Sequence, residues 1–147
     1  MHIIYNFPHV FYPGSNRVLD ARTLRAMIDL LVEANIAYLE ECQRQAHVVS
    51  SLYTSGVRYD RTVWFEPIPA LYARTYGDCK SLSGALIAEK HMQGIKTAPV
   101  FRFFEQPNGI KDYHILVAKD DGSFEDPSKV LGMTDNENAK FFGPDSY

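Results

Sequence analysis

Apolar residues in the first half of the chain recur at helical spacing. From Leu24 onward they fall three or four positions apart over several turns, which predicts a long amphipathic helix over residues 20–50. Asp20 or Thr23 is suitably placed to cap its start, and a Ser- and Thr-rich cluster ending at Gly56 marks its end. This helix is expected to bury one face against the rest of the fold.

A second predicted helix, over residues 79–93, is apolar on nearly all sides. Asp78 is placed to cap its N-terminus, and Gly94 stands where a left-handed stop belongs. A helix with so few polar positions is expected to lie at the centre of the fold.

The regions before this central helix predict shorter elements. Residues 1–20 mix brief apolar runs with prolines, which favours one short strand and a loop. Residues 57–65 are rich in strand formers, and Pro67 and Pro69 then force an irregular connection. A short helix is predicted at residues 70–76.

The second half of the chain is typical of a small antiparallel sheet. Residues 97–104 and 113–118 are rich in Val, Ile, Phe and Tyr, and the turn signal Pro107-Asn108-Gly109 lies between them. Residues 123–126 form the next strand or its exit, and we assign no regular structure to the polar residues 132–147. The predicted fold class is α+β, with N-terminal helices and a buried helix packed on an antiparallel β-meander.

The composition is that of one folded domain covering residues 1–147. Of these 147 residues, 46% are hydrophobic, 13% aromatic and 22% charged, unlike a disordered chain. The net charge of -3 gives no general attraction to nucleic acid or to anionic membranes. No apolar run approaches the roughly 20 residues of a membrane-spanning helix, and the N-terminus lacks a secretory signal. We therefore expect no membrane or nucleic-acid partner and a cytoplasmic location.

No pattern in the sequence indicates a cofactor or a metal. The chain has no Walker loop, no Gly-x-Gly-x-x-Gly and no acidic calcium loop. Four histidines show no ligand spacing with one another or with the cysteines: His2, His9, His47 and His91.

The two cysteines have different surroundings. Cys42 lies on the apolar stripe of the first helix and is expected to be a core thiol. Cys79 lies in the first turn of the buried helix, where the helix dipole favours a thiolate and backbone N–H groups can hold an oxyanion. His114 in the second strand is the candidate general base, and Asp126, after the next turn, is the candidate carboxylate that orients it.

Aromatic residues flank these candidate catalytic residues. They either line a substrate groove and supply an oxyanion donor, or simply pack in the core. The residues are Trp64, Tyr72, Tyr76 and Tyr113.

Three ordered motifs resemble the transglutaminase-like superfamily. Gly77-Asp78-Cys79-Lys80 is similar to its Gly-Asp-Cys opening, and Gly94-Ile95-Lys96-Thr97-Ala98 to the segment that closes its helix. Tyr113-His114-Ile115-Leu116-Val117 and Asp126-Pro127 look like its His strand and Asp-Pro ending. The resemblance covers roughly residues 57–131. Ser81 and Leu116 depart from the pattern, since many relatives have an acidic and an aromatic residue there.

The resemblance implies a papain-like cysteine proteinase fold with a Cys79–His114–Asp126 triad. Such a triad forms a thioester from a peptide or protein amide, which water resolves in a protease or amidase and an amine resolves in a transglutaminase. No cofactor is needed for this chemistry. The alternative is a non-enzymatic assembly module, for example a bacteriophage virion component, whose acidic tail with Phe141-Phe142 docks on a partner.

Overall fold

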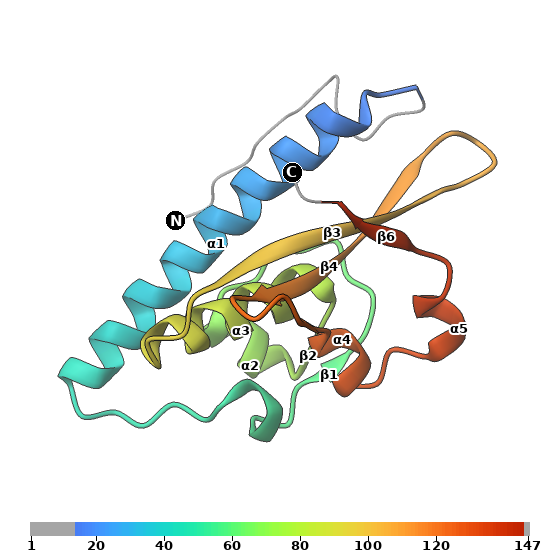
Figure 1. Cartoon of the computed structure of the whole chain (residues 1–147). Coiled ribbons are helices and arrows are strands. Elements are labelled where there is room, and N and C mark those ends of the chain that lie inside the picture. The colour runs from blue at the N-terminus through green and yellow to red at the C-terminus, as the bar shows by residue number, and fades with distance from the viewer. Residues whose placement is uncertain (1–13, 146–147) are drawn as a thin grey trace.

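The structure of the protein is a computed structural model that describes residues 14–145 (Figure 1). The short strand and loop predicted near the N-terminus lie almost wholly outside the described residues. None of the described helices has the length and apolar content that a membrane crossing requires.

The first helix, α1 (Arg17–Arg44), starts and ends earlier than its pattern predicts. Its N-cap is Asn16, whose side chain accepts the backbone N–H groups of Val18 and Leu19, and not Asp20 or Thr23. Asp20 is instead fully buried inside the helix. The predicted C-terminal extension is also wrong, because the chain leaves the helix after Arg44 and residue 46 has a positive φ of 54°.

Several short elements connect α1 to the central helix. They are a 3-10 turn η1 (Leu52–Thr54), strand β1 (Arg58–Tyr59), helix α2 (Ile68–Arg74) and strand β2 (Tyr76–Gly77). β1 pairs in parallel with β2. Of the strand predicted over residues 57–65, only this short segment near its start is a strand in the structure. The remainder, through residue 67, is a loop that matters for the site described below.

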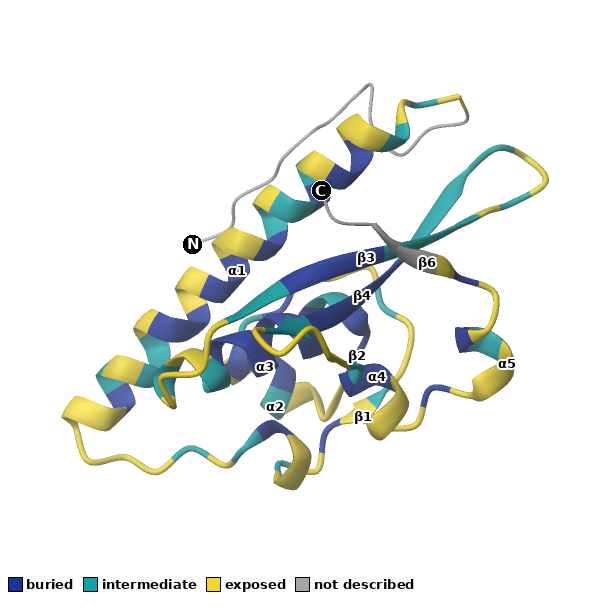
Figure 2. Cartoon of the chain, viewed as in Figure 1, coloured by how far each residue is buried: buried dark blue, intermediate teal, exposed yellow. Residues whose placement is uncertain are grey.

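Helix α3 (Cys79–Met92) matches its sequence prediction closely. The Asp78 side chain caps it by accepting the N–H of Lys80 at 3.2 Å, and Gly94 takes a φ of 74° after its end. α3 contacts α1 along one side and strands β3 and β4 on another (Figure 1). It is the most continuously buried helix in the fold, as the colouring in Figure 2 shows.

Four antiparallel strands form the main sheet: β3 (Thr97–Glu105), β4 (Lys111–Lys119), β5 (Phe124–Glu125) and β6 (Phe142–Asp145), in the order β5-β4-β3-β6. The first three make the predicted meander. Two short helices, α4 (Pro127–Val130) and α5 (Asp135–Asn138), lie between β5 and β6. The expectation of no regular structure after residue 132 is therefore wrong, and the α+β class with an antiparallel sheet is confirmed.

The two faces of the sheet are covered by different parts of the chain. Phe101, Ile115 and Val117 belong to the core cluster that includes the apolar residues of α1 and α3. Because side chains alternate along a strand, His114 points to the opposite face, where it contacts Phe141. The C-terminal segment around α5 thus covers the face on which His114 lies.

Candidate active site

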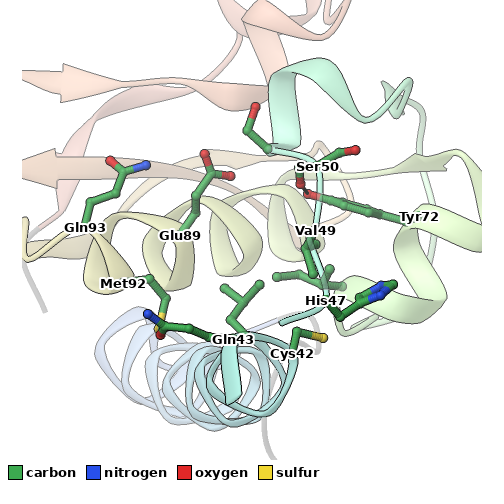
Figure 3. Close-up of a pocket in the computed structure, with 12 residues that line it drawn as sticks. Cys42, Gln43, His47, Val49, Ser50, Tyr72, Glu89, Met92 and Gln93 are labelled. Carbon is green, nitrogen blue, oxygen red and sulfur yellow. Dashed lines mark hydrogen bonds between the residues drawn. The ribbon is translucent and has the colours of Figure 1, made fainter. Parts of the chain in front are cut away.

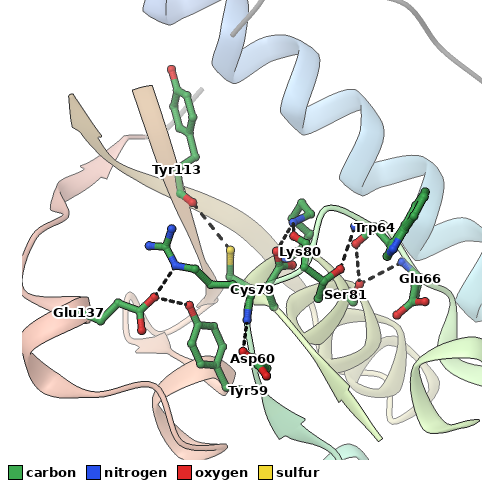
Figure 4. Close-up of polar contacts among 12 residues, drawn as sticks. Tyr59, Asp60, Trp64, Glu66, Cys79, Lys80, Ser81, Tyr113 and Glu137 are labelled. Carbon is green, nitrogen blue, oxygen red and sulfur yellow. Dashed lines mark hydrogen bonds and ion pairs between the residues drawn. The ribbon is translucent and has the colours of Figure 1, made fainter. Parts of the chain in front are cut away.

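Cys79 meets the edge of β4 at the N-terminus of α3. Its Sγ lies 3.8 Å from the backbone oxygen of Tyr113 (Figure 4). One turn further along α3, the hydroxyl of Ser83 donates to the oxygen of Ile115 at 3.1 Å. The first turns of α3 therefore bind backbone groups of β4 next to His114.

This contact is possible because β5 is short. β5 pairs with β4 only at Val117 and Ala118, so the preceding part of that edge has no strand beside it. Buried backbone groups need partners, and α3 provides them through two side chains on one face of the helix. The same arrangement brings the Cys79 thiol to the strand that carries the candidate base.

His114 and Asp126 form the closest pair within the predicted triad. His114 Nε2 lies 2.9 Å from Asp126 Oδ2, and His114 is almost completely buried. Asp126 stands directly after β5 as the N-cap of α4, where its other oxygen accepts the N–H of Lys129 at 3.2 Å. This capping role fixes the direction of the carboxylate.

Asp126 favours one tautomer of neutral His114, and which one depends on whether its carboxyl group is ionised. Burial alone would raise the pKa of Asp126, but the hydrogen bond and charge of His114, with the N–H of Lys129 and the amide of Asn138, outweigh burial and lower it. An ionised carboxylate only accepts hydrogen bonds, so the Nε2 of His114 carries the proton. The lone pair of the neutral ring is then on Nδ1, which is the atom available as a base.

A polar network that the sequence analysis missed supports this pair. The Asn138 amide donates to Asp126 Oδ2 at 2.8 Å, and the Asn138 oxygen accepts from Arg102 Nη1 at 3.0 Å. Arg102 lies directly opposite His114 on β3 and also donates to the oxygen of Phe141. Arg102 could have been found from the predicted pairing of β3 with β4, because it lies opposite His114. Nothing in the sequence around Asn138 indicated its role.

Phe141 has a different role from the one expected. Its ring centroid lies 5.2 Å from that of His114, and the side chain is buried. The prediction that Phe141 and Phe142 together dock on a partner is therefore wrong for Phe141. Phe142 remains 64% exposed.

Cys79 and His114 line the same pocket, which has a volume of about 510 Å³. Tyr113 and Phe65 also line it, whereas Asp126 lies behind His114. The structure thus brings the three predicted residues into one region, with Cys79 and His114 lining a common cavity, although the contact that the thiol makes is with the backbone oxygen of Tyr113 and not with the imidazole. That cavity opens between α1, the loop after β1, the β3–β4 turn and the C-terminal segment.

Ser81 holds the loop that forms one wall of this pocket. Its hydroxyl accepts the N–H of Glu66 at 3.0 Å and donates to the oxygen of Trp64 at 3.3 Å (Figure 4). These two contacts give a structural reason for a serine at this position. Leu116, the second departure, is simply buried.

The other flanking aromatic residues do not share this site. Tyr72 lines a second cavity, whereas Trp64 and Tyr76 are exposed and line neither cavity. The second cavity, of about 350 Å³, lies between the C-terminal ends of α1 and α3 and contains the buried Cys42 (Figure 3). Both cysteines are free thiols, and Cys42 is buried as predicted.

The electrostatics of Cys79 oppose the expected thiolate. Burial raises the pKa of the Cys79 thiol to about 12, with a further rise from the charge of Asp78. The charge of Lys80 and the backbone N–H of Ile115 lower it, but not enough to compensate. Burial therefore favours the neutral thiol over the thiolate that the helix N-terminus was expected to stabilise.

Among residues 14–145, no group of three or more His, Cys, Asp or Glu side chains is arranged to hold a metal ion.

Comparisons of the chain with protein-family models, with curated proteins and with solved structures find no match.

Proposed function

We propose that the protein is a thiol acyl-transfer enzyme that cleaves amide bonds through Cys79, His114 and Asp126. The observation that carries the proposal is the His114–Asp126 pair, whose tautomer leaves Nδ1 as a base on a residue lining the pocket of Cys79. A buried imidazole with an ionised carboxylate behind it is an arrangement that supports general-base catalysis.

In the first step, Nδ1 of His114 takes the Cys79 proton while the sulfur attacks the amide carbonyl carbon. The C–S bond forms, and the backbone N–H of Cys79 at the start of α3 stabilises the oxyanion. His114 then returns the proton to the amide nitrogen, the C–N bond breaks, and an amine leaves. Asp126 stabilises the imidazolium between these two transfers.

The thioester that remains is resolved in a second acyl transfer. We propose water as the acceptor, activated by His114, which releases a carboxylic acid and regenerates the thiol. An amine acceptor would give a transglutaminase instead. This chemistry needs no cofactor.

We also propose a transglutaminase-like, papain-like core. Three features support it: a cysteine that begins a buried helix, a histidine on the antiparallel strand beside that cysteine, and an Asp-Pro pair after the next short strand. The chain order of these features agrees with the resemblance in the sequence.

The test is the alkylation rate of Cys79 by iodoacetamide between pH 6 and pH 9, followed by peptide mass mapping. We expect His114→Ala to slow it at least about tenfold, since a positioned base contributes about 10²–10⁴-fold to proton transfer. His91→Ala, at an exposed position on α3, is the matched control. Equal rates in all three proteins, no faster than that of Cys42, would contradict the proposal.

A second candidate function is a non-enzymatic assembly module, such as a virion component. The observation that favours it is the buried, neutral thiol of Cys79, which is only 8% exposed and has a raised pKa. This alternative predicts an inert Cys79 together with a stable ring or partner complex in sedimentation measurements.

A further inference from the structure

The cavity that contains Cys79 has a distinctive lining. Its partly exposed apolar side chains come from three separate parts of the chain: Met27 on α1, Phe65 on the loop after β1, and Ile110 in the β3–β4 turn. Buried Met133 and Phe141 complete an apolar wall beside His114. Apolar surface therefore faces the cavity from several sides.

The positively charged side chains that line this cavity already have partners within the chain. Arg61 pairs with Glu137 at 2.9 Å, and Lys111 donates to the backbone oxygen of Ser15 at 2.8 Å. Lys80 contacts Asp78 and also donates to the backbone oxygen of Thr62 at 3.0 Å.

The negatively charged groups are occupied in the same way. Asp78 accepts from Lys80, and Asp112 accepts the side-chain amide of Gln106 at 2.8 Å. These are the two carboxylates that line the cavity, and Glu137, the partner of Arg61, lies outside the lining. A charged substrate group would have to compete with these contacts for the same side chains, whereas an apolar group would not.

We infer that the cavity binds amide substrates whose side chain beside the reacting carbonyl is large, apolar and uncharged. Leucine- and phenylalanine-type amides fit this description, and glutamine, glutamate and lysine do not. The volume of about 510 Å³ lies within the usual range for small-molecule sites. This inference rests on the proposed function, because it assigns the cavity to the substrate of Cys79.

The experiment measures binding without turnover. The full-length Cys79→Ala protein is titrated with N-acetyl amides of leucine, phenylalanine, glutamine, glutamate and lysine, and amide chemical shifts are followed by NMR. We expect the leucine and phenylalanine amides to bind at least about tenfold more tightly than the other three, as expected for burial of a large apolar side chain. The shifted signals should map to Met27, Phe65 and Ile110.

A matched pair of variants on α1 tests the position of the site. Met27→Asp places a charge in the cavity and should weaken phenylalanine-amide binding about tenfold, whereas Leu30→Asp, at an exposed position one turn away, should not. Circular dichroism confirms that both variants are folded. The series of five amides needs neither variant and so tests the inference independently.

Three results would overturn the inference: equal or tighter binding of the charged or glutamine amides, shifts confined to residues outside the cavity, or no saturable binding of any amide. The alkylation experiment above is separate from these. If the apolar amides bind selectively but Cys79 is inert, the binding site is retained and the proposed chemistry is rejected. If Cys79 alkylation depends on His114 but the amides show no apolar preference, the proposed chemistry is retained and the apolar site is rejected.

Discussion

The side-chain amide of Asn138 donates to Oδ2 of Asp126, the oxygen that also receives the ring N–H of His114. The two distances are 2.8 Å and 2.9 Å. One carboxylate oxygen is thus held from two directions, by a strand residue and by a residue of α5. The C-terminal segment is therefore a structural part of the candidate site.

Replacing Asn138 with Leu should slow Cys79 alkylation about tenfold and reduce stability. The change removes a buried donor to Asp126 and a partner of Arg102, and loss of such a partner costs about 1–3 kcal/mol. Alkylation kinetics and urea denaturation measure the two effects. Asn136→Leu, at an exposed position on the same helix, is the control, and equal effects in both variants would argue against a positioning role for Asn138.

Acid should weaken the fold through Asp126. Its pKa is lower in the folded chain than its usual value, so the carboxylate contributes stability above about pH 4, and this contribution is lost as the pH falls through the folded-state pKa. Asp126→Asn should lower the free energy of unfolding at pH 7 by about 1 kcal/mol or more. Between pH 5 and pH 3 this variant should lose less stability than the native chain does. Urea midpoints across this range provide the measurement.

The control for this acid dependence is Asp120→Asn, at an exposed turn. It should leave the midpoint at pH 7 nearly unchanged. If Asp126→Asn retained the full acid dependence of the native chain, other carboxylates would have to be responsible.

The sequence predicted the parts of the site that depend on local signals. Asp78 at a helix start, the apolar helix after it and the Pro-Asn-Gly turn are all short-range features, and the structure has each of them. The meander then follows from the turns, and it places His114 near Asp126. Their 2.9 Å contact agrees with the predicted pairing.

The parts that the sequence did not predict depend on long-range contacts. The segment after residue 132 is polar and has no periodicity, yet Asn138 and Phe141 are ordered by Arg102 and His114 on distant strands. The raised pKa of Cys79 has a similar origin. It comes mainly from burial, which the position of a residue in a helix does not reveal.

Two opposite substitutions should shift the pH profile of Cys79. The charge of Asp78 raises the thiol pKa and that of Lys80 lowers it, so Asp78→Asn should lower the pKa and Lys80→Met should raise it. Alkylation at pH 8 should be severalfold faster in the first variant and slower in the second, because the thiolate is the nucleophile. Asn can still cap α3, which preserves the helix. Shifts in the same direction for both variants would contradict this account.

Gly84 allows α1 and α3 to approach closely. A Cβ at this position would lie 2.9 Å from Cδ2 of buried Leu31. Gly84→Ala should therefore destabilise the protein by about 1–3 kcal/mol, although alanine favours a helix. In a Leu31→Ala background the same change should cost less or even stabilise, and a double-mutant cycle by urea denaturation measures the difference. Additive effects would show that the two residues do not compete for space.

Thr75 offers a substitution that should stabilise the fold. It is exposed, β-branched and has a φ of 70°, a left-handed conformation that an L residue adopts at a cost of about 1–3 kcal/mol. Its N–H donates to the oxygen of Leu71 at 2.9 Å, a contact that glycine keeps. Thr75→Gly should therefore raise stability by about 0.5–1 kcal/mol, after allowing for the greater freedom of glycine in the unfolded chain.

The matched control for Thr75→Gly is Ala73→Gly, at an exposed position inside α2. There the backbone is helical, so glycine should lower stability by about 1 kcal/mol. Thermal unfolding of both variants tests the opposite signs. A lower Tm for Thr75→Gly would mean that the left-handed turn after α2 is not strained, and that the loss of the Thr75 side chain outweighs any conformational relief.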